Sequence, residues 1–176
     1  MTAASTIPIA STPPGGYGDP ALDRYDRVMP DPVLAGCDEP LVDGAPDLRG
    51  TWRAVEVRTG GELAPQDGDD MISRVWSHHE RIEQAGSRAV VTGGGVVHDF
   101  FSCDGTEEHG LHDVLATDFA TPLVVVGSYE DDALVMRPTE MPGIEVKRWR
   151  EGDELVWEYS VFFTVRMQRV DAGAAR

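Results

Sequence analysis

The chain has 176 residues, 41% of them hydrophobic, which is enough for one compact domain with its own core. The 31 Asp and Glu residues outnumber the 15 Lys and Arg residues and give a formal net charge of −16. This acidity excludes nucleic acid and anionic membrane surfaces from the expected partners, because both require a basic face.

The chain shows no sign of a targeting or membrane segment. Residues 1–16 have neither the basic start nor the apolar centre of a signal peptide, and no window approaches the roughly 20 apolar residues of a transmembrane helix. Cys37 and Cys103 are too few for a disulfide framework, so we expect reduced thiols, with a single bridge between them as the alternative. We therefore expect a cytoplasmic protein with no membrane partner. The sequence leaves a homodimer open.

Residues 1–47 are predicted to form an irregular N-terminal arm. Residues 1–20 are rich in Ala, Ser, Thr, Pro and Gly, which predicts a poorly ordered segment. Residues 19–28 have the pattern of one or two helical turns, with Asp19 as N-cap and Pro20 as first helical residue. Residues 29–47 contain four prolines, so no long element fits there. The arm is either a disordered tail or a lid over the mouth of a cavity.

Residues 48–170 are predicted to fold as one all-β domain. After a short helical turn near residues 70–74, short stretches of period two alternate with turns rich in Gly, Asp and Pro. The expected strands are 50–58, 74–83, 88–92, 96–102, 123–129, 133–137, 144–150, 154–161 and 163–170, with a further strand within 107–116. Hairpin links leave no room for crossover helices. We therefore predict an up-and-down antiparallel β-barrel of about 8–10 strands, wide enough for one small ligand, followed by a frayed tail at 171–176.

Both ends of the predicted barrel resemble a known superfamily. Gly50-Thr51-Trp52 is similar to the Gly-X-Trp signature of the calycins, which include the lipocalins and the fatty-acid-binding proteins. The run from Ile144 to Trp157, continued to Val170, resembles the closing strands of the fatty-acid-binding proteins. A basic strand, an acidic turn, a Leu-Val strand and a final Arg-Val follow there in the same order. The resemblance covers residues 48 to 170 in topology and implies a calycin-like barrel that encloses a small hydrophobic molecule.

The chain also departs from the calycin families that it resembles. Fatty-acid-binding proteins hold a carboxylate with an Arg and a Tyr two positions apart on the last strand, and the aligned positions here hold Val165 and Met167. Arg166 lies on the opposite face of that strand. Nitrobindins, a similar class of haem-binding barrel, have a glycine-rich signature after the first Trp, which is absent after Trp52. The carboxylate clamp of the fatty-acid-binding proteins is therefore not carried over.

All five histidines lie between residues 78 and 112. If Trp76 faces the interior, then His78 and Glu80 share its face, and a His with a carboxylate two positions away can move a proton on a bound substrate. The alternative is a polar strand face in water. Parity groups His98 with Phe100 and Asp99 with Phe101, so one of these two polar side chains points inward among apolar neighbours, either as a catalytic or ligand-orienting group or as a satisfied core residue.

Further residues are expected to contact a ligand without doing chemistry. Trp157 and Tyr159 alternate on one face of the penultimate strand, and Arg148 is an interior cation for an anionic ligand or a partner of Glu80 or Asp113. Trp76, Phe100 and His112 complete the expected binding residues. His109 and His112 are three apart, which is not a same-face spacing on a strand, and no compact metal motif occurs. We therefore expect no metal site and no cofactor, with haem held by one His as the alternative.

Three functions are compatible with these patterns. The first is binding of a small hydrophobic organic molecule inside the barrel. The second is a cofactor-free cyclase or isomerase of specialised metabolism, similar to lipocalin-like cyclases, with His78 or His98 as acid or base and Glu80 or Asp99 as its partner. The third is haem or metal binding. A fold alone does not decide among them.

Overall fold

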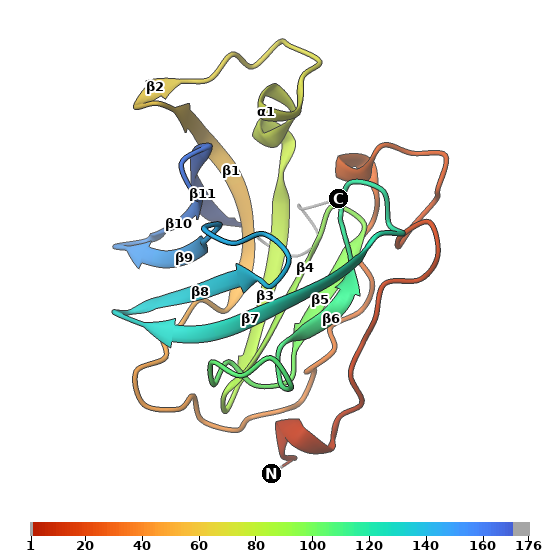
Figure 1. Ribbon diagram of the computed structural model, residues 1–176, viewed down its shortest axis with the longest axis vertical. Helices are drawn as coiled ribbons and strands as arrows, with labels where there is room; N and C mark the ends of the chain where they lie inside the picture. The colour runs from red at the N-terminus through yellow and green to blue at the C-terminus, as the bar shows by residue number, and fades with distance from the viewer. Residues whose placement is uncertain (1, 171–176) are drawn as a thin grey trace.

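Ten antiparallel strands follow one another around a nearly closed barrel in the computed structural model, which describes residues 2–170 (Figure 1). Their order is β5-β4-β3-β1-β11-β10-β9-β8-β7-β6, and the two-residue strand β2 (Glu62–Leu63) pairs with β1. The predicted all-β, up-and-down barrel is therefore confirmed. The predicted tail at 171–176 lies outside the described residues. The strand bounds are β1 Gly50–Thr59, β3 His79–Ala85, β4 Arg88–Gly93, β5 Val96–Phe100, β6 Leu111–Val114, β7 Pro122–Glu130, β8 Ala133–Pro138, β9 Val146–Glu151, β10 Glu154–Tyr159 and β11 Phe163–Val170.

The predicted strand over 74–83 begins later than expected. Asp70 caps a helical turn, α1 (Met71–Arg74), by accepting hydrogen bonds from the Ile72 and Ser73 amides at 3.1 and 3.0 Å. A 3₁₀ turn, η3 (Val75–Ser77), follows, so β3 starts only at His79. The chain therefore enters β3 from a helical turn at one end of the barrel.

The first strand pairs with the last and closes the sheet at that seam. The register of β1 with β11 runs from Thr51 opposite Val170 to Arg58 opposite Thr164, with an irregularity between Ala54 and Glu56. An irregularity of this kind increases the local twist and helps a long strand to bend around a barrel.

The Gly-X-Trp signature has a physical explanation at this seam. Gly50 has a φ of +143°, and a Cβ atom there would lie 2.8 Å from Nη1 of Arg169. Because Gly50 has no side chain, the Arg169 guanidinium lies 4.6 Å from the centre of the fully buried Trp52 ring. The Trp52 indole nitrogen donates to the Leu48 carbonyl at 2.9 Å, which satisfies its polar atom.

Within the described residues, β5 and β6 are not paired by backbone hydrogen bonds, and the N-terminal arm bridges part of the gap between them. The amide of Val97 on β5 donates to Oγ1 of Thr12 at 3.1 Å, and the amide of Thr12 donates to Oδ2 of Asp113 on β6 at 2.9 Å. Further along, the Ser102 amide donates to the His109 carbonyl at 3.1 Å. The arm therefore supplies hydrogen bonds that a sheet edge would otherwise lack.

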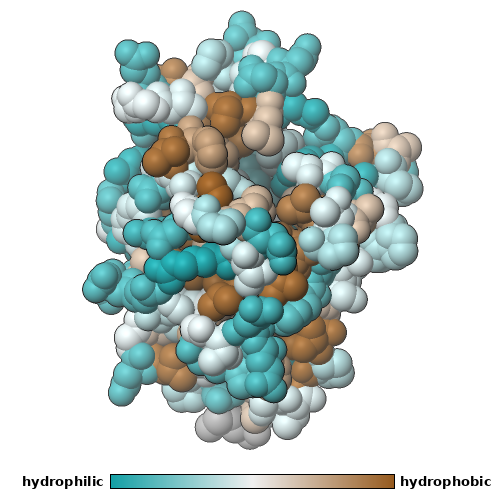
Figure 2. Space-filling view, in the orientation of Figure 1, coloured by the Kyte–Doolittle hydropathy of each residue, from teal (hydrophilic) through white to brown (hydrophobic). Residues whose placement is uncertain are grey.

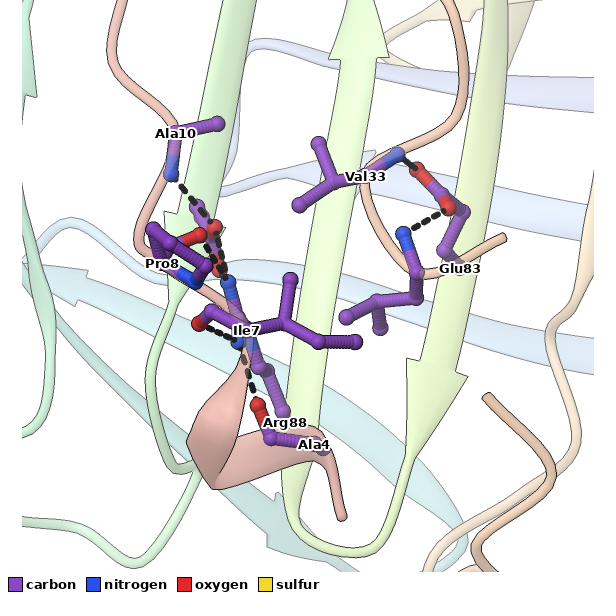
Figure 3. A network of polar contacts seen from close by, with 9 residues as sticks. Ala4, Ile7, Pro8, Ala10, Val33, Glu83 and Arg88 are labelled. Carbon is purple, nitrogen blue, oxygen red and sulfur yellow. Dashed lines mark hydrogen bonds and ion pairs between the residues drawn. The ribbon is translucent and has the colours of Figure 1, made fainter. Parts of the chain in front are cut away.

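The arm packs against the outer face of β3, β4 and β5 rather than hanging free as a poorly ordered leader. It contains two 3₁₀ turns, η1 (Ala4–Thr6) and η2 (Arg24–Asp26), the second capped by Asp23 and not by Asp19. A second hydrophobic cluster lies beneath the arm and includes arm and barrel residues together: Ala4, Leu34, Ala85, Val90 and Val97. Both faces of these strands are consequently buried. Figure 3 shows the polar contacts that hold the arm, from Arg88 to Ala4, Ile7 and Pro8 and from Glu83 to Val33.

Candidate functional site

A cavity of about 440 Å³ lies inside the barrel. Its wall comes from the inward faces of β3 to β11, from α1, and from the loops that surround its mouth. Most of the lining side chains are apolar or aromatic, among them Val91, Phe100, Leu111, Val125, Met136, Val146, Trp157 and Phe163. The polar lining residues are Arg24, His78, Glu80, His98, Thr117 and Arg148.

The N-terminal arm contributes to this wall through Arg24 and Tyr25 of η2. The Tyr25 ring lies edge-on to His78, with 5.9 Å between the ring centres. Asp23, next to them, forms an ion pair with Arg74 of α1. In Figure 1, η2 (orange) and α1 lie at the same end of the barrel. The arm therefore forms part of the rim around the cavity mouth.

The rim carries exposed apolar side chains. Met71 on α1 lines the cavity and is 65% exposed, and Phe162 in the turn between β10 and β11 lines it and is 52% exposed. In the upper part of Figure 2, over α1 and β2, hydrophobic residues lie among hydrophilic ones. An apolar rim of this kind favours the approach of a hydrophobic molecule.

The centre of the site is a buried ion pair between Glu80 and Arg148. Arg148 donates from Nε to Glu80 Oε2 at 2.7 Å and from Nη2 to Oε1 at 3.1 Å. Nε2 of His78 lies 2.6 Å from Glu80 Oε1. Of the interior roles predicted for Arg148, the structure therefore shows the pairing with Glu80.

Electrostatics fix the protonation of this group. Burial raises the pKa of Glu80, but the charge of Arg148 and the hydrogen bond from His78 outweigh it and lower that pKa to about 2. Burial lowers the pKa of His78, although Glu80 opposes this change. At neutral pH, Glu80 is thus ionised and His78 is neutral. Because an ionised carboxylate only accepts hydrogen bonds, His78 carries its proton on Nε2 and leaves Nδ1 unprotonated.

His98 lies on β5 at the gap in the barrel and lines the cavity. Its Nε2 is 3.1 Å from the Val114 carbonyl of β6, to which it donates across the gap. Burial lowers the pKa of His98, so the ring is neutral at neutral pH. It therefore both links the two edge strands and presents a polar ring to the interior.

An aromatic wall faces the histidine. The Trp157 ring lies 4.5 Å from that of His78, and Phe163 packs edge-on against Trp157 at 5.1 Å. Tyr159 stacks on Phe163 at 5.2 Å, and the Arg148 guanidinium lies 5.1 Å from the centre of the Trp157 ring. The predicted aromatic stripe of β10 is thus part of the cavity wall.

Three of the expected site residues lie outside the cavity wall. Asp99 points to the outer face of β5, where it pairs with Arg88, so it cannot assist His98. Trp76 sits in η3, packs against the core from its edge and donates to the Ala64 carbonyl at 3.2 Å. His112 is exposed on β6 and its ring lies 2.9 Å from the Glu107 carbonyl. The other expected residues line the cavity: His78, Glu80, His98, Phe100, Arg148, Trp157 and Tyr159.

Sequence reasoning missed the residues that reach the cavity from outside the strands. These come from the arm, from α1 and from loops, where no period-two pattern marks an inward face. The Leu22-Tyr25 spacing was a signal for a helical turn, and the lid hypothesis could have brought Tyr25 into the site. The missed residues include Arg24, Tyr25, Met71, Leu115, Thr117, Met141 and Phe162.

Two features are absent from the described part of the chain. Within residues 2–170, no group of three or more His, Cys, Asp or Glu side chains is placed to hold a metal ion. None of the helices described there has the length and apolarity needed to cross a membrane. Cys37 and Cys103 are both free.

Comparison with solved structures identifies the fold. No protein-family model matches the chain, and no curated protein matches its sequence significantly. Among solved structures, human cRBP IV superposes with a TM-score of 0.52 at 19% identity, over 70% of this chain and 98% of that chain. The chain has the calycin barrel fold. The zebrafish ileal bile acid-binding protein complexed with cholic acid also matches, with a TM-score of 0.49, 14% identity, and coverage of 69% and 98%.

Within this calycin barrel, the last strand shows what replaces the carboxylate clamp. Val165 and Met167 of β11, at the two aligned positions, are both fully buried in the main hydrophobic core. Arg166 instead forms ion pairs on the outer face with Glu151 and Glu154. The charged or imidazole side chains that line the cavity from a strand are instead Glu80 of β3, His98 of β5 and Arg148 of β9.

Proposed function

We propose that this protein binds a small hydrophobic organic molecule inside its barrel. The observation that carries the proposal is the 440 Å³ cavity, walled mainly by apolar side chains and reached through an apolar rim. Cavities of roughly 300–1,000 Å³ with a few placed polar groups are typical of small-molecule sites. A barrel that was filled by its own side chains would have no such space.

The arm supports this proposal as a lid. Arg24 and Tyr25 cover part of the wall near His78, while the rest of the arm is held to the barrel by buried hydrogen bonds. A turn held at its flanks can move without unfolding the strands beneath it. The ligand would enter past η2 and α1.

The test is binding of the uncharged dye Nile red, followed by its fluorescence. Val91 lines the cavity from β4, and Val91→Trp places a bulky ring in that space. We expect the wild-type protein to bind the dye and the variant to lose at least about tenfold in affinity. Val55→Trp, at a position on β1 that is 40% exposed, is the matched control and should bind as the wild type does. Equal binding by all three proteins would assign the dye to the surface and contradict the proposal.

A second candidate function is acid–base catalysis in the same cavity, as in a cofactor-free isomerase or cyclase. It is favoured by His78, whose side chain lines the cavity, whose Nε2 lies 2.6 Å from the Glu80 carboxylate and whose unprotonated Nδ1 has no hydrogen-bond partner. Such a base can remove a proton from a carbon next to a carbonyl and return it at another carbon. Conversion of an apolar β,γ-unsaturated ketone to its conjugated isomer, followed by ultraviolet absorbance, tests this function. Turnover by the wild-type protein that is lost in His78→Ala would support catalysis. If the wild-type protein shows no turnover, ligand binding remains as the proposed function.

A further inference from the structure

Two buried aromatic-ring nitrogen atoms, on side chains of the cavity wall, have no hydrogen-bond partner. They are Nδ1 of His78 and Nε1 of Trp157, on side chains that line the cavity and belong to residues only 5% and 8% exposed. Buried polar atoms in folded proteins nearly always have a partner. Two orphaned atoms on neighbouring rings therefore point to a polar group on whatever occupies the cavity.

The two atoms differ in what they offer. Nε2 of His78 donates to the ionised Glu80, so Nδ1 has a lone pair and accepts a hydrogen bond. The indole nitrogen of Trp157 carries a hydrogen and can only donate. The ring centres are 4.5 Å apart, so the wall presents one acceptor and one donor in the same region.

A hydroxyl group matches this pair. It donates one hydrogen bond and accepts up to two, whereas a carboxylate or a methyl ether only accepts and would leave His78 without a partner. The buried Nε of Arg24 is also without a partner, on another side chain that lines the cavity. Arg148 is already neutralised by its two hydrogen bonds to Glu80, so it does not call for an anionic ligand.

We propose that His78 and Trp157 form a subsite for a hydroxyl group on an otherwise apolar ligand, an alcohol, phenol or enol. The hydroxyl donates to His78 Nδ1 and accepts from Trp157 Nε1. Glu80 and Arg148 are positioning residues, because they fix the proton on the opposite side of the imidazole ring. This inference rests on the proposed binding function and specifies the chemical class of the ligand.

The experiment compares three probes of the same shape by isothermal titration calorimetry: biphenyl, 4-phenylphenol and 4-methoxybiphenyl. Biphenyl measures binding to the apolar wall alone, and the methyl ether can accept but not donate. We expect 4-phenylphenol to bind the wild-type protein about tenfold more tightly than either of the others, because it satisfies both buried atoms. In His78→Phe and in Trp157→Phe this preference should shrink or vanish while biphenyl still binds.

His79→Phe is the matched control. His79 is also buried and follows His78 directly, but it lies outside the cavity wall, so the preference for 4-phenylphenol should persist. Imidazole ¹⁵N spectra of the wild-type protein give a readout that needs no variant. Nδ1 of His78 should have the shift of an unprotonated nitrogen, and 4-phenylphenol, but not biphenyl, should change it.

The possible failures are distinguishable. Equal affinities of the wild-type protein for 4-phenylphenol and 4-methoxybiphenyl, with biphenyl bound, would overturn the subsite and leave the binding function standing. Water would then be the partner of the two nitrogens. An unchanged ¹⁵N signal on addition of 4-phenylphenol would overturn it as well. Failure of all three probes to bind would overturn both the subsite and the proposed function.

Discussion

Arg88 and Asp99 form a bidentate ion pair on the outer face of the barrel, with Nε 2.9 Å from Oδ1 and Nη2 2.7 Å from Oδ2. Both side chains are almost completely buried, because the arm covers them. Arg88 also donates to the carbonyls of Ala4, Ile7 and Pro8, and Asp99 accepts from the amide of Ala10 (Figure 3). The pair thus joins two barrel strands to residues 4–10 of the arm.

We predict that Arg88→Met lowers the free energy of unfolding by about 3–5 kcal/mol. The substitution leaves the Asp99 carboxylate buried without its cation, which is the costly way to break a buried pair. It also removes three donors from arm carbonyls, so the Ala10 amide should exchange its hydrogen faster. Urea unfolding and hydrogen exchange measure the two effects.

Arg49→Met is the matched control for this prediction. Arg49 pairs with Asp47 at 2.8 Å, but the two side chains are 51% and 52% exposed. An exposed pair contributes about 1 kcal/mol or less. A loss for Arg88→Met as small as that of the control would mean that water reaches Asp99 and that the arm is not fixed by this pair.

The strands could be predicted because each carries its own pattern. Trp157 and Tyr159 alternate with outward residues, and turns such as Glu151-Gly152-Asp153 mark the strand ends, so the barrel follows from local information. The same parity put His98 and Asp99 on opposite faces of their strand. It could not say which of the two was the interior residue, because both faces of β5 are apolar and both are buried.

The arm could not be predicted in this way. Its composition is typical of disordered segments, and its order depends on partners about 80 residues away, such as Arg88 for Ile7 and Pro8. Arg88 shows no sign in the sequence that it will be buried. The residues of the cavity rim could not be predicted for the same reason, because Tyr25 contacts His78 only after the arm has folded along the barrel.

We predict that Tyr25→Ala speeds both the dissociation and the association of an apolar dye, the dissociation by about tenfold. Tyr25 lines the cavity beside His78, and its removal opens the wall at the rim. Stopped-flow fluorescence with Nile red measures both rates. Leu22→Ala, at an arm residue that is 44% exposed, should leave them unchanged. Identical dissociation from both variants would exclude η2 as a barrier to ligand exit.

The stability of the protein should fall in mild acid. Burial is the main cause that lowers the pKa of His78, His79 and His98 from 6.5, so the unfolded chain binds protons at a higher pH than the folded one. The contribution of these histidines to the free energy of unfolding is therefore fully present above about pH 6.5 and is lost as the pH falls. For each histidine the loss is about 1.4 kcal/mol per pH unit between its pKa in the unfolded chain and its lower pKa in the folded protein.

Urea unfolding at about pH 7.5 and about pH 5.5 measures this dependence. The groups that act on His78 are Glu80 in its own segment, Arg148 on β9 and Arg24 in the arm. His78→Gln should show a smaller loss between the two pH values than the wild type. His109→Gln should show a larger one, because Asp104 raises the pKa of His109 and gives that residue the opposite sign. A wild-type stability that is the same at both pH values would contradict the prediction.

The interior pair of Glu80 and Arg148 should respond differently to single and double substitution. Glu80→Gln leaves the 6% exposed Arg148 without its carboxylate, so we expect unfolding to become easier by about 3–5 kcal/mol. Glu80→Leu combined with Arg148→Met replaces both charges by apolar groups and should be close to the wild type in stability. Urea unfolding at neutral pH compares the three proteins. If Glu80→Gln were as stable as the wild type, water in the cavity would have to solvate Arg148, and the site would be wetter than its apolar wall implies.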